Sequence, residues 1–210
     1  MTSIFRIFFF LTISSVVCPG QSFEGKVTYE TAYKSKIPNV TDALFTEMMG
    51  KSQEYNLKNG NYRTTSNGTF LQWQLYLNKD NKLYTKFSNS ASVLWNDGAV
   101  NPDSVLKTEF NKEIIDILGY KCDELILTCR SGIQKYYFNS KLKIDPKLFE
   151  NHKFGNWYQY LSHSQAVPLK MILDNVQFSV VIVATAIQPQ KIDDQLFLLP
   201  ADAKLEKSPF

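Results

Sequence analysis

The fold class is decided by residues 73–87, which read Trp73-Gln74-Leu75-Tyr76-Leu77-Asn78-Lys79-Asp80-Asn81-Lys82-Leu83-Tyr84-Thr85-Lys86-Phe87. Two runs with apolar residues at every second position flank the turn at 78–81, which is the pattern of two antiparallel strands joined by a hairpin. The same period of two recurs in Lys26–Tyr33, and turn signals such as Asn59-Gly60 follow about every eight to twelve residues. The sequence therefore predicts a mainly β protein of the α+β kind, built on an antiparallel meander.

Further strands are predicted on both sides of this stretch, in segments 26–33, 93–95, 125–129, 133–138, 169–173 and 178–186. We expect residues 114–138 to form the centre of the sheet. A helix is predicted after Asn39, which would cap it, with Gly50 at its end. Short helices are also predicted after Asp145, where proline follows the capping residue, and over 157–161. The charged tail 204–209 is expected to fray.

The amino terminus has the pattern of a secretory signal peptide. Arg6 precedes a mostly apolar run of about eleven residues, 7–17, and Cys18-Pro19-Gly20 follows it. A membrane-spanning helix needs about 20 apolar residues, and no later segment reaches that length without a charge or a turn. We therefore predict a signal peptide over 1–20, a single β-rich domain over 21–210, and no transmembrane segment. Lipidation of Cys18 is the alternative to simple cleavage.

The charge balance argues against nucleic acid as a partner. The chain has 23 basic and 20 acidic residues, a formal net charge of +3, and removal of Arg6 leaves 22 against 20, or +2. The basic residues are dispersed between apolar and acidic neighbours, as in segment 141–153, so they form no basic patch.

Cys122 and Cys129 are the two cysteines of the expected mature chain. Export would favour a disulfide, since oxidising compartments allow thiols to pair. If 120–129 is one continuous strand, however, seven residues at about 3.3 Å each separate the two Cα atoms by about 23 Å, whereas a disulfide needs about 4.4–6.8 Å. We therefore predict that both remain free thiols, unless the strand bends near Asp123.

No enzyme motif is present in the sequence. It contains no Gly-x-Ser-x-Gly elbow, no Gly-x-Gly-x-x-Gly loop and no phosphate-binding lysine loop. The two histidines, His152 and His163, have no neighbouring ligand set for zinc and are interpreted as surface residues. The sequence thus predicts a non-enzymatic protein with no catalytic residues, no metal and no cofactor. Ser104 lies in an Asp-Ser-apolar triplet of the kind that some bacteria glycosylate, and its modification stays open.

Several segments resemble a known superfamily. They are the strand start 25–30, Leu118-Gly119-Tyr120-Lys121-Cys122, the region from Tyr158 to Pro168-Leu169-Lys170, and Lys191-Ile192-Asp193-Asp194-Gln195-Leu196-Phe197-Leu198-Leu199-Pro200. With these, the chain resembles secreted bacterial proteins of unknown function related to the outer-membrane lipoprotein carrier (LolA-like) half-barrel superfamily. The resemblance implies a single curved antiparallel sheet or half-open β-barrel, with a few short helices covering its concave face. It also implies an exported protein that is periplasmic or envelope-associated in a Gram-negative bacterium, or secreted.

Bulky apolar residues are the candidates to line such a concavity, because small-molecule sites are mostly apolar hollows. They are Trp73, Leu75, Trp95, Phe149, Trp157 and Tyr160. The same residues could equally be ordinary core. We expect an envelope protein that binds or carries a hydrophobic ligand, either a lipid or an acyl chain, including one on an acylated protein. The alternative is a structural or protein-interaction component of the cell envelope without a small-molecule ligand, which exposed strand edges would favour.

Overall fold

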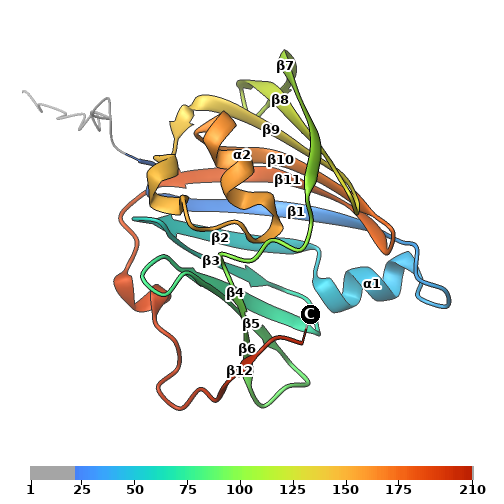
Figure 1. Ribbon diagram of the computed structural model, residues 1–210, viewed down its shortest axis with the longest axis vertical. Coiled ribbons are helices and arrows are strands. Elements are labelled where there is room, and N and C mark those ends of the chain that lie inside the picture. The colour runs from blue at the N-terminus through green and yellow to red at the C-terminus, as the bar shows by residue number, and fades with distance from the viewer. Residues whose placement is uncertain (1–21, 210) are drawn as a thin grey trace, which may run out of the picture.

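The computed structural model describes residues 22–209. The expected signal peptide over 1–20, and Cys18 with it, lie outside the described residues. In the described part, twelve strands form one open, curved sheet in the order β12-β6-β5-β4-β3-β2-β1-β11-β10-β9-β8-β7 (Figure 1). Every neighbouring pair is antiparallel except β12 and β6, which are parallel. The predicted fold, a curved antiparallel sheet in the shape of a half-open barrel, is confirmed.

The strand bounds are β1 (Gly25–Ser35), β2 (Ser52–Lys58), β3 (Asn61–Ser66), β4 (Leu71–Leu77), β5 (Lys82–Phe87), β6 (Val93–Asp97), β7 (Val105–Ile117), β8 (Tyr120–Cys129), β9 (Gly132–Lys143), β10 (Ala166–Asn175), β11 (Phe178–Pro189) and β12 (Leu205–Lys207). The helices are α1 (Asp42–Met49), α2 (Trp157–Ser164) and the 3-10 turns η1 (Pro146–Phe149), η2 (Phe154–Asn156) and η3 (Asp194–Phe197).

The first strand joins two meanders into one sheet. Strands β2 to β6 pair in sequence on one side, β7 to β11 pair in sequence on the other, and β1 pairs with both β2 and β11. The centre of the sheet therefore lies at β2, β1 and β11, and the prediction that residues 114–138 form the centre is wrong. Turn signals in the sequence indicate which consecutive strands form hairpins. They do not indicate which strand at the end of each meander pairs with β1.

Two tight turns show why particular residues end the strands. Asn59 and Gly60 have φ values of 47° and 78° between β2 and β3, as expected for a two-residue hairpin turn in which both residues have positive φ. Leu118 and Gly119, with φ of 51° and 79°, turn the chain in the same way between β7 and β8. This second turn separates β7 from β8, whereas the sequence pattern alone predicts no break between residues 114 and 122.

Helix α1 begins at a different cap from the predicted one. The Thr41 hydroxyl accepts a hydrogen bond from the backbone N–H of Leu44 at 3.1 Å, whereas Asn39 has a φ of 64° and belongs to the preceding turn. Asn39 therefore does not cap the helix, because Thr41 has the extended backbone that an N-cap requires. Gly50 ends the helix as predicted.

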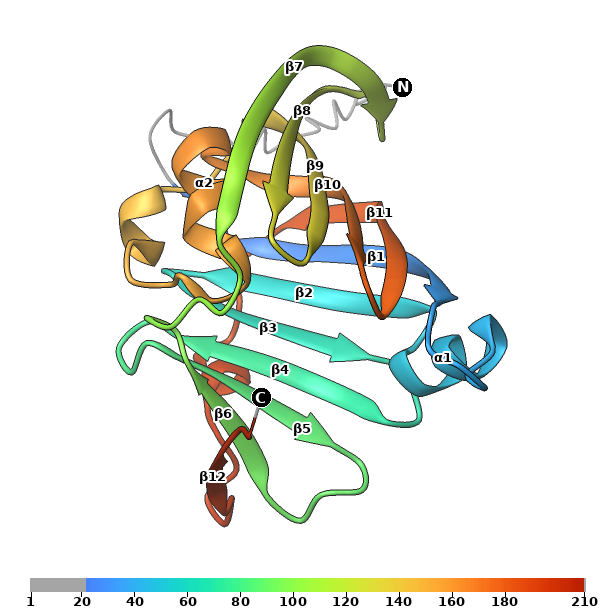
Figure 2. The same ribbon diagram turned by 45° about the vertical axis from the view of Figure 1, so that its right-hand side comes forward.

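The chain between β9 and β10 covers the concave face. Asp145 caps η1 and accepts from the N–H of Lys147, and α2 follows η2, so both predicted helical segments are confirmed. Figure 2 shows α2 in front of the upper strands, with the C-terminal segment on the other side of β4 to β6. That segment does not fray at its end, because residues 205–207 pair with β6 as β12.

Each side of the sheet has its own core. The larger cluster includes Phe149, Tyr160 and Tyr76, between the sheet and α2. The smaller cluster joins Leu75 and neighbours on β4 to β6 with Ile192 and Phe197 of the C-terminal segment. Cys122 and Cys129 are buried free thiols on the continuous strand β8, so the prediction that they do not pair is confirmed.

Candidate functional site

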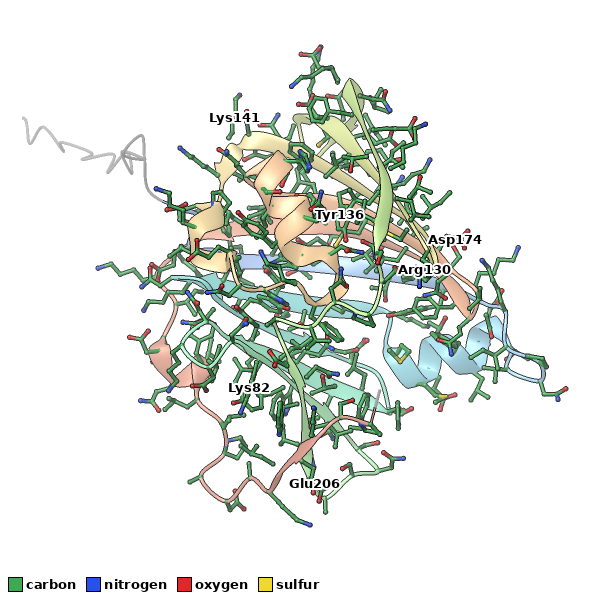
Figure 3. The ribbon with its side chains drawn as sticks, in the orientation of Figure 1. Lys82, Arg130, Tyr136, Lys141, Asp174 and Glu206 are labelled. Carbon is green, nitrogen blue, oxygen red and sulfur yellow. The ribbon has the colours of Figure 1, made fainter. Side chains whose placement is uncertain are left out.

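The concave face holds a group of stacked aromatic side chains under α2. Tyr136 on β9 lies beside α2 (Figure 3) and stacks on Tyr160 of that helix, with ring centroids 4.2 Å apart. The Tyr160 hydroxyl donates to the carbonyl oxygen of Ala166 at 2.9 Å, which fixes the ring against the start of β10. Trp157 packs 5.5 Å from Tyr160 and faces Tyr55 of β2 at 6.5 Å. The helix therefore fills much of the hollow.

His152 lies in the same core and not on the surface, which corrects the sequence-based interpretation. It is 1% exposed, its ring stacks on Tyr76 at 3.9 Å, and its Nε2 is 2.9 Å from the Tyr62 hydroxyl. Its Nδ1 has no hydrogen-bond partner among the described residues. Burial away from water disfavours the charged ring and lowers the pKa of His152 from 6.5 to about 3, so the ring is neutral. His163 is exposed, as predicted.

A cavity of about 110 Å³ remains between α2 and the central strands. Its walls come from β1, β2, β3, β10 and α2, and they are mostly apolar. The residues that line it are Tyr29, Gln53, Tyr55, Tyr62, Thr64, Trp157, Pro168 and Met171. The Tyr29 hydroxyl donates to the Pro168 carbonyl oxygen at 2.7 Å, so this bond ties two walls of the cavity together.

Two buried hydrogen-bond donors in this wall have no partner among the described residues. They are the hydroxyl of Tyr55 and the indole Nε1–H of Trp157. Burial raises the pKa of Tyr55 well above its usual value, and the neighbouring hydroxyls of Tyr62, Tyr29 and Tyr160 raise it further, so its proton is retained. A buried donor without an acceptor costs about 1–3 kcal/mol. Such groups in an apolar wall mark a place where an acceptor would be stabilised.

The six residues predicted to line a ligand site fall into two groups. Phe149, Trp157 and Tyr160 lie together in the concave core, and of these only Trp157 lines the cavity. Leu75 belongs to the smaller core on the other face, where Trp73 and Trp95 pack against it. There Arg63 lies 4.6 Å from the ring centre of Trp73, and Lys82 (labelled in Figure 3) lies 4.2 Å from that of Trp95.

Sequence reasoning missed the tyrosines that form most of the cavity wall. Tyr29, Tyr55 and Tyr62 lie on three adjacent strands, and their rings point to the concave side. The period of two in β1 predicts that Tyr29 shares a face with Val27, but it does not predict which face of the sheet is concave. The sequence signal that could have identified this wall is the presence of a tyrosine on each of these neighbouring strands.

Within residues 22–209, no group of three or more His, Cys, Asp or Glu side chains is arranged to hold a metal ion. None of the helices in this range is long and apolar enough to cross a membrane.

Comparison with known proteins gives similarity of structure only. No protein-family model matches the sequence, and no curated protein matches it. A structure of PNGF-II is similar with a TM-score of 0.48 and 16% identity over 89% of this chain, which spans only 31% of that chain. An uncharacterized conserved protein from Thermus thermophilus has a TM-score of 0.47 and 6% identity, covering 88% of this chain and 91% of that one. A LolA superfamily protein from Nitrosomonas europaea has a TM-score of 0.36 and 10% identity, covering 85% and 91%.

Proposed function

We propose that this protein is a non-enzymatic, exported binding or carrier protein whose cavity under α2 takes an acyl group bearing a neutral hydrogen-bond acceptor. The observation that carries the proposal is the apolar cavity whose wall contains two buried donors without partners, on Tyr55 and Trp157. The signal-peptide pattern at 1–20 supports a role outside the cytoplasm.

The chemistry of the wall favours a neutral ligand. None of the described residues that line the cavity carries a charge. A carboxylate would therefore lose its hydration without gaining a cation, which costs far more than one hydrogen bond returns. The carbonyl oxygen of an ester or amide can accept from Tyr55 or Trp157 without that cost, while the hydrocarbon part meets aromatic and methionine side chains.

The size of the cavity limits what enters. Typical small-molecule pockets measure about 300–1,000 Å³, and this cavity measures about 110 Å³. A short acyl group, or the end of a longer chain, fits without displacement of α2. Each buried methylene contributes about 0.8 kcal/mol, so affinity for acyl methyl esters should rise with chain length until the cavity is full.

The change Tyr55→Phe tests the role of the unpartnered hydroxyl. Removing it should raise the free energy of unfolding of the free protein by about 1 kcal/mol, because a buried donor without a partner disappears. The same change should weaken binding of an acyl methyl ester about fivefold, since one hydrogen bond of about 1 kcal/mol is lost. Calorimetric titration and urea denaturation measure the two effects.

Tyr29→Phe is the matched control, because the Tyr29 hydroxyl already has an acceptor in Pro168. This variant should be less stable by about 1 kcal/mol. If Tyr55→Phe destabilised the protein as Tyr29→Phe does and left ester affinity unchanged, the hydroxyl of Tyr55 would have no part in binding.

A further inference from the structure

Strand β7 forms a long free edge of the sheet. It is the last strand in the order, with β8 on one side and no strand of the described chain on the other. Figure 2 shows β7 arching away from the body of the protein at the upper edge. Most of its side chains are exposed on both faces, and the apolar ones include Leu106, which is 67% exposed, and Phe110, which is 44% exposed. Exposed edges with apolar side chains are templates for pairing with another strand.

An open groove of about 510 Å³ borders the first half of this edge. It lies between residues 105–108 of β7 and a facing wall that contains Lys153, Asn156 of η2 and Tyr158 of α2. The opposite edge of the sheet differs, because β12 is only three residues long there. Short edge strands are a common protection against unwanted pairing, and β7, with 13 residues, lacks it.

The regular part of β7 has defined limits. Its register against β8 shifts between Val105 and Lys107 and again between Asn111 and Ile115, where Glu113 has a φ of 50°. Residues 107–111 pair regularly between these two irregularities. A partner strand would therefore add to this segment, because bulges interrupt the ladder on either side.

The partner that fits this segment is a second copy of the same strand. When two identical antiparallel strands pair about a two-fold axis, the residue on the axis faces itself. An axis at Lys107 or Glu109 places like charges opposite each other. An axis at Thr108 places Lys107 opposite Glu109 of the other copy, twice.

The positions of the charged side chains on β7 are compatible with an axis at Thr108. Lys107 and Glu109 lie on one face of β7 and form an ion pair of 2.9 Å, with both side chains well exposed. Across the axis, the four charges of two copies would alternate in sign around a square. Opposite-charge cross-strand pairs stabilise a sheet, whereas like charges directly opposite destabilise it.

We propose that β7 pairs antiparallel with β7 of a second copy about an axis at Thr108, so that two sheets join into one. This interface is separate from the cavity under α2 and does not depend on the proposed ligand. It gives the protein a self-association surface along the β7 edge centred on Thr108.

Charge exchange across the axis tests the register. Sedimentation velocity of the native protein over a concentration series should show a monomer–dimer equilibrium. Lys107→Glu alone, and Glu109→Lys alone, should each weaken dimerisation about tenfold or more, because two attractive pairs become repulsive. An equimolar mixture of the two variants should dimerise again, since each heterodimer restores both attractive pairs. Lys141→Glu, a change of the same charge at an exposed site on β9 (Figure 3), should leave dimerisation unchanged.

Several outcomes would overturn the proposal. A native protein that stays monomeric at the highest concentration reached would show that the edge does not self-associate. A Glu109→Lys variant that dimerises like the native protein would place the contact in another register or on another surface. Failure of the mixture to recover dimers beyond either variant alone would show that Lys107 and Glu109 do not face each other.

Discussion

Tyr160→Ala is expected to lower the free energy of unfolding by about 3–5 kcal/mol, as large-to-small changes of buried aromatic residues do. Tyr160 has no exposed surface, stacks on Tyr136 and donates to the Ala166 carbonyl oxygen. Its removal would leave a cavity under α2 and one buried carbonyl without its donor. Urea denaturation measures the loss, which should appear as a lower midpoint with an unchanged slope.

Tyr158→Ala is the control for this experiment, because Tyr158 lies on the same helix but is only partly buried. Its ring contacts the Lys153 ammonium at 3.7 Å, a contact that contributes about 1 kcal/mol or less at an exposed site. If the two variants lost equal stability, α2 would not be packed into the hollow of the sheet as described, and the cavity would be larger than 110 Å³.

Acidification from pH 7 to pH 5 is expected to cost the folded protein about 2 kcal/mol through His152 alone. The pKa of His152 falls from 6.5 to about 3 on folding, because the ring is buried away from water. Below pH 6.5 the unfolded chain binds a proton that the folded chain does not, so stability decreases as the pH falls towards 3. The calculation uses about 1.36 kcal/mol for each pH unit below the unfolded pKa.

His152→Gln removes this titration. The free energy of unfolding should then differ between pH 7 and pH 5 by about 2 kcal/mol less than in the native protein. His163→Gln is the matched control, because it makes the same substitution at an exposed position. The quantity compared is the difference between the two pH values, so any loss of packing in His152→Gln cancels. Equal pH dependence in the native protein and His152→Gln would show that His152 is accessible to protons in the folded state.

The extent to which the sequence predicted this fold depends on whether a strand buries one face, two faces or neither. Strands that bury one face, such as β1, show the period of two and were found. Leu75 and Tyr76 are both buried because β4 is covered on both faces, so alternation does not show which of them belongs to the core under α2. Strand β7 buries almost nothing, and most of its length has no apolar pattern from which it could be recognised.

The candidate site was harder to predict for the same physical reason. Trp157 was chosen from the sequence as a bulky apolar residue on a predicted helix, and the structure places it in the cavity wall. Tyr29, Tyr55 and Tyr62 lie on strands whose order along the chain is predicted by the sequence. The sequence does not predict which face of the sheet these side chains lie on. His152 gave no signal, since its burial results from the turn after η1 and from stacking on Tyr76, a residue 76 positions earlier in the chain.

The most direct test of the central proposal uses Trp157 as a reporter inside the cavity wall. In a Trp73→Phe/Trp95→Phe variant, Trp157 is the one tryptophan left of the three in the chain. Titration with a brominated short-chain acyl methyl ester should quench its fluorescence in a saturable way, because bromine would be held beside the indole ring. In a Trp157→Phe variant, where Trp73 and Trp95 remain on the other face of the sheet, the same titration should give no saturable quenching. Absence of saturable quenching in the first variant, or equal quenching in both, would contradict the proposal that the cavity under α2 binds an acyl group.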